Sequence, residues 1–328
     1  MNFCTLPLNY SQWYMTDIFC IGELLIDFVA ENQGSDLIKA NDFTKKAGGA
    51  AANVASAISK LGGKSYFIGC VGKDPFGTFL LNVLKDGKVD ISMAQRSKKF
   101  TTLAFVSLAE DGERDFVFSR GADRELKYDT AIKKHFNKSL VHFGAATALL
   151  GGTMEEAYNH YLFDALTQES FISFDPNYRG DLWKENEASF IKKCLPYVEK
   201  SHLCKFSLEE ALLLSGKETV EEACLYLHEI GVKIITVTLG KEGTFLSMDG
   251  YTKLVPSIKV SPVDTTGAGD AFIGCLLYQI SELNNFNTVF DNKELLTAMI
   301  EKANKAGAIT TTQYGAIVAL PTLNQLDS

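Results

Sequence analysis

Short apolar runs alternate with amphipathic segments along most of the chain. The apolar runs lie at 17–30, 64–72, 139–145, 170–177, 202–207 and 233–240. Runs of this kind are typical of strands covered on both faces, as in a parallel sheet. Their alternation with helical segments predicts an α/β fold with a mostly parallel central sheet and helices on both faces.

Helical periodicity is clearest in three segments, 48–63, 74–90 and 219–230. In the first, small residues precede the periodic part and Gly62 is a stop signal. In the second, Asp74 has the position of an N-cap and Pro75 that of the first helical residue. The three segments are therefore predicted to be helices between strands.

The pattern changes at 100–120, where two strand-like runs flank the turn sequence EDGE at 110–113. Two such runs around a short polar turn predict a β-hairpin. Because it departs from the strand–helix alternation, we expect the hairpin to be an insertion at an edge of the main sheet. Parts of 24–45 and of 99–120, which includes the hairpin, are expected to form a small β lid or a dimer contact.

The composition favours a globular protein, with 328 residues, 46% of them hydrophobic and 22% charged. We expect one domain over 16–328, because no linker, repeat or low-complexity tract interrupts it. Residues 1–15 lack the basic and apolar regions of a signal peptide. They are expected to be a disordered leader or the product of an upstream start codon.

The net charge of −8 argues against a nucleic-acid or anionic-membrane partner. No apolar run approaches the roughly 20 residues of a membrane span. The seven cysteines form no C-x-x-C pair and the five histidines no metal-binding pattern, so reduced thiols and a cytoplasmic location are expected.

Candidate chemistry is concentrated in VDTTGAGDAF at 263–272. A glycine-rich turn that opens a helix presents backbone N–H groups to an anion, and the helix dipole favours negative charge there. Asp270 follows this turn directly, where a carboxylate could accept a proton from a hydroxyl that attacks a phosphoryl group. The alternative is a structural turn in which Asp270 only caps the helix.

Other nucleotide-binding signatures are absent from the sequence. GGKS at 62–65 has the end of a Walker A loop, but position 58 is Ile where that loop needs Gly. No G-x-G-x-x-G follows a strand, which disfavours a nicotinamide oxidoreductase.

Two longer segments resemble a known family. DTTGAGDAFIGCLL at 264–277 resembles the C-terminal signature of the ribokinase-like (pfkB) sugar kinases, and AGGAAANVASAISKLG at 47–62 resembles their N-terminal signature. Within the family, the segments at 101–123, 175–179, 205–211 and 303–322 are most similar to fructokinases. The resemblance implies a ribokinase-like fold over 16–328 and ATP-dependent phosphorylation of a sugar, with Mg²⁺ carried on the nucleotide.

The resemblance also implies roles for individual residues. Asp270 matches the catalytic base, and Gly267, Ala268 and Gly269 match the anion hole for the transferred phosphoryl group. The residues that match sugar-contacting positions are Asp27, Gly48, Gly49, Asn53, Arg120 and Arg179. For the two arginines, a surface salt bridge is the alternative.

Nucleotide contacts are implied for Lys205, Ser207, Glu210, Thr238, Gly240, Gly243 and Asn304. Glu210 matches the acidic end of an N-x-x-E motif that orders magnesium-bound water, but Ser207 stands where the family has Asn. A monovalent-cation site, usually for K⁺, is implied near Asp264, Thr266, Thr310, Gln313 and Gly315.

The expected reaction is conversion of fructose and ATP to fructose 6-phosphate and ADP, with sugar and ATP as partners and a possible homodimer through the lid. Ribose, 2-keto-3-deoxygluconate and a nucleoside remain alternative substrates. A non-catalytic sugar-binding protein on the same fold is the alternative of another class.

Overall fold

The structure, a computed structural model, describes residues 15–31, 37–108, 114–183 and 186–328. The expected leader falls almost wholly outside these residues, as does the EDGE turn. In the described part, the central sheet has the strand order β14-β13-β12-β11-β10-β9-β1-β4. Its strands are β1 (Ile18–Ile21), β4 (Ser65–Ile68), β9 (Leu140–Gly144), β10 (Phe171–Asp175), β11 (Leu203–Ser207), β12 (Ile234–Thr238), β13 (Thr244–Met248) and β14 (Tyr251–Val255).

The sheet is parallel from β12 to β4, and β13 and β14 add an antiparallel edge. Because side chains alternate along a strand, each buried strand contributes to two cores. Ile18 and Cys20 of β1 belong to the core on one face, and Phe19 and Ile21 to the core on the other. The predicted α/β fold with a mostly parallel sheet is confirmed.

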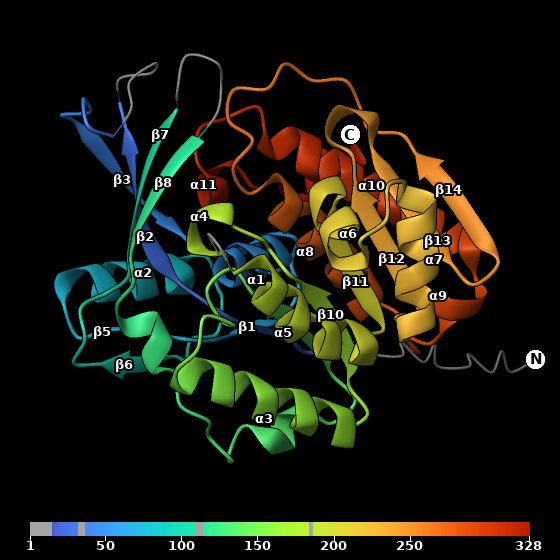
Figure 1. The fold of residues 1–328 in the computed structure, drawn as a ribbon, viewed down its shortest axis with the longest axis horizontal. Coiled ribbons are helices and arrows are strands. Elements are labelled where there is room, and N and C mark those ends of the chain that lie inside the picture. Colours follow the sequence, from blue (N-terminus) through green and yellow to red (C-terminus); the bar gives the residue numbers. More distant parts are fainter. Residues whose placement is uncertain (1–14, 32–36, 109–113, 184–185) are drawn as a thin grey trace, which may run out of the picture.

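Helices cover both faces of the sheet (Figure 1). One face carries α1 (Ala50–Lys60), α2 (Pro75–Asp86), α8 (Ala268–Ser281) and α10 (Lys293–Thr310). The other carries α3 (Thr153–Thr167), α5 (Glu187–Lys200), α6 (Leu208–Ser215) and α7 (Val220–Ile230). Shorter helices are α4 (Gly180–Trp183), α9 (Thr288–Asp291), α11 (Ala316–Ala319), α12 (Leu323–Asp327), η1 (Ala122–Glu125), η2 (Lys133–Phe136) and η3 (Gly240–Glu242).

A second sheet of four strands, here called the small sheet, stands beside the central one (Figure 1). It has the order β3-β2-β7-β8, formed by β2 (Leu25–Ala30), β3 (Phe43–Gly48), β7 (Leu103–Leu108) and β8 (Arg114–Ser119). The predicted hairpin corresponds to the antiparallel pair β7 and β8. A separate parallel pair is formed by β5 (Cys70–Gly72) and β6 (Gln95–Ser97).

The prediction of one strand over 17–30 is wrong, because the chain leaves the central sheet after Ile21 and enters the small sheet at Leu25. Gly22 lies at this break, and a Cβ atom there would be 2.5 Å from Ala51 Cβ and 2.9 Å from the Gly144 carbonyl oxygen. The apolar run at 64–72 divides in the same way into β4 and β5. Unbroken hydrophobicity does not distinguish one long strand from two strands in different sheets.

The predicted starts of the second and third helices agree closely with the structure, whereas the predicted end of the second, at 90, is wrong because α2 ends at Asp86. The first helix is α1, which ends at Lys60 just before Gly62, and the second is α2, whose N-cap Asp74 accepts a hydrogen bond from Gly77 N at 3.0 Å. The third is α7, which follows the N-cap Thr219. Local capping signals therefore predicted these boundaries.

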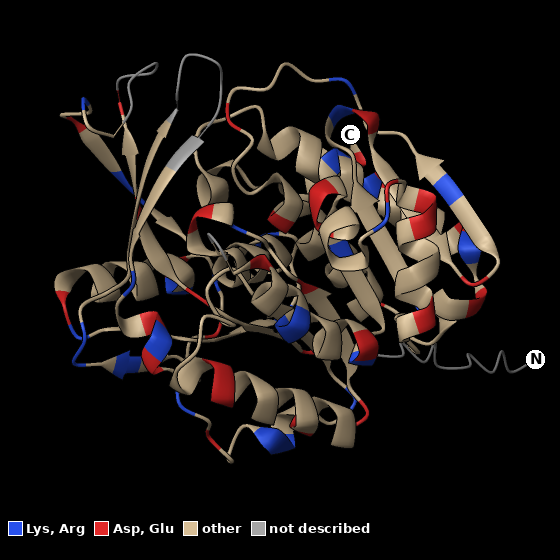
Figure 2. Ribbon diagram, viewed as in Figure 1, with Lys and Arg blue, Asp and Glu red and all other residues tan. Residues whose placement is uncertain are grey.

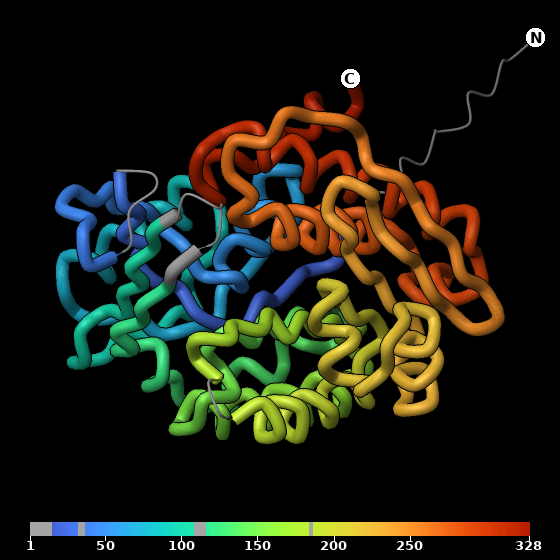
Figure 3. The backbone as a smooth tube through the Cα atoms, turned by 45° about the horizontal axis from the view of Figure 1, so that its top comes forward, coloured from blue at the N-terminus to red at the C-terminus, as the bar shows by residue number. Residues whose placement is uncertain are grey.

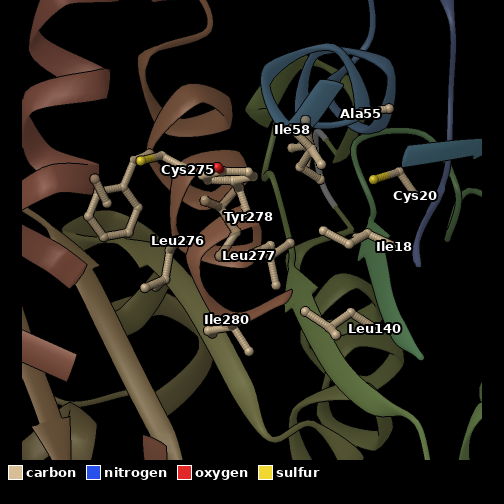
Figure 4. Close-up of a cluster of buried hydrophobic side chains, with 14 of the residues drawn as sticks. Ile18, Cys20, Ala55, Ile58, Leu140, Cys275, Leu276, Leu277, Tyr278 and Ile280 are labelled. Carbon is tan, nitrogen blue, oxygen red and sulfur yellow. The ribbon is translucent and has the colours of Figure 1, made fainter. Parts of the chain in front are cut away.

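Helix α8 is anchored by buried side chains along most of its length. Figure 4 shows Leu277 and Ile280 of α8 near Ile18 of β1 and Leu140 of β9, all fully or almost fully buried. Burying one such side chain contributes about 1.5–3 kcal/mol. Figure 3 shows α8, in orange, beside α1, in blue, against which it packs. The N-termini of these two helices therefore have fixed positions relative to each other.

Positively and negatively charged residues are interspersed over the elements of the fold (Figure 2). In the described part of the chain, no helix is both long and apolar enough to cross a bilayer. The six described cysteines are free and buried, in line with the expected thiols.

Candidate active site

The N-terminus of α8 begins at a glycine that the conformation requires. Gly267, its N-cap, has φ 79°, and a Cβ atom there would lie 2.6 Å from Ala316 Cβ. A larger residue would be strained both in backbone and in packing. No described side chain caps this helix, so its N-terminal dipole is available to an anion.

Asp270 lies in the first turn of α8 and is 9% exposed. Asn53 Nδ2 of α1 donates a hydrogen bond to Asp270 Oδ2 at 2.8 Å. Burial raises the pKa of Asp270 to about 6, and the Asn53 hydrogen bond, Lys205 and Arg179 limit the rise. The carboxylate is thus a stronger base than an exposed aspartate while still ionising near neutral pH.

A buried ion pair lies next to this turn. Lys205 Nζ of β11 is 3.0 Å from Asp175 Oδ2 at the end of β10, and the two side chains are 8% and 1% exposed. A Cβ atom on Gly269 would lie 3.0 Å from Lys205 Nζ. Burial alone would lower the pKa of Lys205, but Asp175, Glu210 and Asp270 raise it above the ordinary value. A permanent positive charge therefore lies beside the first turn of α8.

Helix α1 also begins after glycine, but its N-terminus is occupied. Gly49 has φ 110° and makes no side-chain cap, and the neighbouring Ala50 N donates to Glu23 Oε1 at 2.6 Å. A Cβ atom on Gly49 would be 2.4 Å from the Glu23 carbonyl oxygen. Of these two glycine-initiated helices, α8 is therefore the one that can receive an anion.

A cavity of about 670 Å³ extends from Ala268 and Gly269 along α8 and α10. This volume is within the range of small-molecule sites. The predicted nucleotide residues in its wall are Thr238, Gly240, Gly243 and Asn304. The Asn304 side chain is engaged within the wall, since its Nδ2 donates to the Val255 carbonyl at 2.9 Å and its Oδ1 accepts from Thr244 at 2.6 Å.

A second cavity, of about 680 Å³, lies between the small sheet and the loop 262–266. Asp27 of β2 and its antiparallel partner Lys46 of β3 line it. Gly48 leaves room for Asp27, because a Cβ atom there would be 1.9 Å from Asp27 Oδ2. Pro262 and Thr265 border both cavities, so this loop separates them next to the N-terminus of α8.

The loop 262–266 is held by Asp264. Its Oδ1 accepts from Thr266 N at 2.9 Å, and its Oδ2 accepts from Gly315 N at 2.9 Å. Three of the five predicted cation ligands are thereby brought together. The other two, Thr310 and Gln313, are expected to contribute backbone oxygens, and their place in a cation site stays a prediction.

Comparison with known proteins identifies the family over most of the chain. The family model described as "pfkB family carbohydrate kinase" matches residues 15–323. The chain belongs to this family. A protein of Arabidopsis thaliana described as "Probable fructokinase-2" is 37% identical over 309 residues, which are 93% of each chain.

Two similar solved structures are fructokinases. The fructokinase of Xylella fastidiosa with bound ATP has a TM-score of 0.83 and 27% identity, covering 95% of this chain and 97% of that one. A double mutant of the Vibrio cholerae O395 fructokinase, with fructose, ADP and a potassium ion bound, has a TM-score of 0.82 and 28% identity at the same coverages. Both structures match this chain over 95% of its length, so the likeness includes the whole fold and not only the site.

In this pfkB kinase the two predicted arginines differ in environment. Arg120 Nε donates to Asp123 Oδ2 at 3.0 Å, and Asp123 also accepts from Thr102 Oγ1. Arg179 Nη1 donates to the Tyr178 carbonyl at 2.9 Å, and its charge acts on Asp270. Arg179 therefore lies near the base, whereas Arg120 forms a largely buried ion pair.

Ser207 and Glu210 form a capping box at the start of α6. Glu210 Oε2 accepts from Ser207 N and Oε1 from Tyr178 N, each at 2.7 Å. Glu210 thus connects the loop after β10 to the end of β11. Its part in ordering magnesium-bound water stays a prediction.

Sequence reasoning missed Glu23 and the pairing of Asp175 with Lys205 as parts of the site. A signal for Glu23 was present, because it is an acidic residue inside the apolar run at 17–30, as Asp27 is. Asp175 likewise lies inside the apolar run at 170–177. The pairing itself has no local signal, because its partners are 30 residues apart.

Proposed function

We propose that the protein is a fructokinase that transfers the γ-phosphoryl group of ATP to the 6-hydroxyl group of fructose. The observation that carries the proposal is the position of Asp270. It lies in the first turn of an uncapped helix, beside a buried cation and bonded to Asn53. Cavities adjoin this helix N-terminus on both sides of the loop 262–266.

In the proposed mechanism, fructose is held by Asp27, the Gly48–Gly49 backbone and Asn53, and its hydroxyl group faces Asp270. The carboxylate accepts the hydroxyl proton as the oxygen attacks the γ-phosphorus atom, and the bond between that atom and the β-phosphate oxygen breaks to release ADP. The backbone amides of Gly267, Ala268 and Gly269 hold the charge on the transferred group, and Lys205 adds positive potential beneath them. The small sheet excludes water from the sugar.

We propose that ATP occupies the 670 Å³ cavity with its phosphates toward Ala268 and Gly269. Mg²⁺ bound with ATP would supply positive charge that offsets the negative charge of the phosphates. No group of three or more His, Cys, Asp or Glu side chains in the described part of the chain could hold a metal, which fits an ion carried by phosphates. A K⁺ site at the loops joined by Asp264 is the corresponding proposal for the monovalent cation.

We further propose one catalytic domain over 16–328, with the small sheet as its lid, acting in the cytoplasm. Homodimerisation through the lid remains an expectation. The geometry of Arg120 disfavours an acidic sugar such as 2-keto-3-deoxygluconate, because its charge is already paired with Asp123.

The pH dependence follows from the raised pKa of Asp270, which is about 6. The base must be ionised to accept a proton, so kcat/KM should rise with pH through this region and fall about tenfold for each unit below it. A pH series of initial rates at saturating Mg²⁺ measures this limb. A flat profile between pH 5 and 7 would contradict the assignment of Asp270.

The substrate is tested by ADP release with ATP and Mg²⁺ across a sugar panel, with and without K⁺. The panel holds fructose, ribose, 2-keto-3-deoxygluconate, glucose, mannose and adenosine. A clear preference for fructose is the expected result. Preference for another sugar would retain the kinase chemistry and overturn the substrate, whereas ATP binding without turnover of any sugar would favour a binding protein.

A further inference from the structure

We propose that Glu23 is a positioning residue for the catalytic base: it holds the N-terminus of α1, and α1 presents Asn53 to Asp270. This role rests on the proposed kinase function. Glu23 lies between β1 and β2, is 1% exposed, and belongs to none of the motifs by which the family is recognised in this chain.

The first link is the long-range cap. Glu23 Oε1 accepts from Ala50 N at 2.6 Å, and Gly49 offers no side chain for this purpose. The backbone of 23–24 also fits tightly against Gly49, where a Cβ atom would be 3.0 Å from Leu24 Cα. Glu23 therefore determines where α1 begins.

The second link runs along α1 to the base. Ala50 and Asn53 are one turn apart on the same face of the helix, and helical side chains lean toward the N-terminus. The Asn53 side chain thus lies over the turn that Glu23 holds. Its Nδ2 donates to Asp270 Oδ2 at 2.8 Å, so a shift of α1 would move the donor away from the base.

The environment of Glu23 favours the neutral form of its carboxyl group. Burial raises its pKa to about 7, hydrogen bonds from backbone N–H groups limit the rise, and the nearby charges of Asp123 and Asp270 add to it. Glu23 also interacts electrostatically with Tyr158. Glu23 Oε2 and Asn53 Oδ1 are both buried without a hydrogen-bond partner among the described residues. A neutral Glu23 supplies an O–H donor to this region, whereas an ionised one would add a second acceptor and a negative charge beside the phosphoryl site.

The test is a double-mutant cycle of Glu23→Ala and Asn53→Ala. Each single variant should lower kcat about 10- to 100-fold, as expected for misplacement of a catalytic group. The double variant should be no slower than the slower single variant, because both remove the same support. Independent, multiplying losses would overturn the proposal.

A second readout does not depend on turnover. Selective ¹³C labelling of Asp side chains, with the Asp270 signal assigned from Asp270→Asn, gives the pKa of Asp270 by NMR titration. Because the Asn53 hydrogen bond lowers that pKa, Asn53→Ala should raise it. Glu23→Ala should raise it relative to Glu23→Gln, which removes the same charge but keeps an acceptor for Ala50 N. An equal pKa of Asp270 in Glu23→Ala and Glu23→Gln would overturn the role of Glu23. If the wild-type protein phosphorylates no sugar, the proposed function fails and this titration alone decides the inference.

Two controls separate positioning from general destabilisation. Glu23→Gln keeps a neutral acceptor for Ala50 N and should retain most of kcat at pH 7; it also tests the proposal if Glu23→Ala does not fold. A decrease in kcat of Glu23→Gln as large as that of Asn53→Ala would contradict the positioning role of Glu23. Asp164→Asn alters another buried carboxyl group, bonded to Tyr128 on the far side of the sheet, and should leave both kcat and the pKa of Asp270 unchanged.

Discussion

Replacing Asp270 with Asn is expected to lower kcat by about 10²-fold or more, the usual cost of losing a general base. The amide has the size of the carboxylate and can still accept a hydrogen bond from Asn53, but it cannot take a proton from the sugar. The measurement is steady-state kcat with fructose and ATP at pH 7.5. Near-normal turnover would remove Asp270 from its catalytic role.

The controls for this variant are its fold and its nucleotide binding. The described groups in the wall of the 670 Å³ cavity do not include the Asp270 side chain. Calorimetric titration with ATP should therefore give a Kd for ATP within about threefold of the wild-type value. The reason is that the substitution changes no residue in the wall of the cavity, and substitutions away from packed or paired groups have small energetic effects. Loss of ATP binding together with activity would point to a disturbed helix α8 instead of a missing base.

Replacing Lys205 with Met is expected to have the largest effect on stability. Removing one partner of a buried ion pair leaves the other charge uncompensated and costs about 3–5 kcal/mol. Asp175 would be that charge, since it is 1% exposed and 3.0 Å from Lys205 Nζ. Urea unfolding measures the free-energy change, and kcat should also fall because the positive charge beside Gly269 is lost.

The double variant Asp175→Asn with Lys205→Met distinguishes the two effects. Stability should largely return, because no unpaired charge remains buried, while kcat should stay low. Lys302→Met is the matched surface control: its ion pair with Asp327 is exposed, and such pairs contribute about 0–1 kcal/mol. Equal destabilisation by Lys205→Met and Lys302→Met would contradict the importance of the buried pair.

The fold class and several helices could be predicted because their signals are local. Apolar runs and capping residues lie next to each other in the chain, as at Asp74 and Thr219, and they acted as expected. The break of the first apolar run could not be predicted in the same way. It depends on the close approach of Gly22 to Ala51 and Gly144, which are distant in sequence.

The candidate site also has a part with local sequence signals and a part that depends on tertiary contacts. The glycines and the aspartate at 267–270 are adjacent in the chain, so the N-terminus of α8 could be recognised from the sequence. The contacts that tune Asp270 are tertiary: Asn53 is 217 residues away from it, and Glu23 acts through the start of α1. Only the three-dimensional arrangement shows that one glycine-initiated helix is capped by a carboxyl group and the other is not.

We propose that the enzyme transfers a phosphoryl group from ATP to fructose at the N-terminus of α8. The most direct test is NMR identification of the product formed from uniformly ¹³C-labelled fructose with ATP and Mg²⁺. We expect fructose 6-phosphate, one molecule for each ADP released. ADP accompanied only by inorganic phosphate, or a sugar phosphorylated at another carbon, would contradict it.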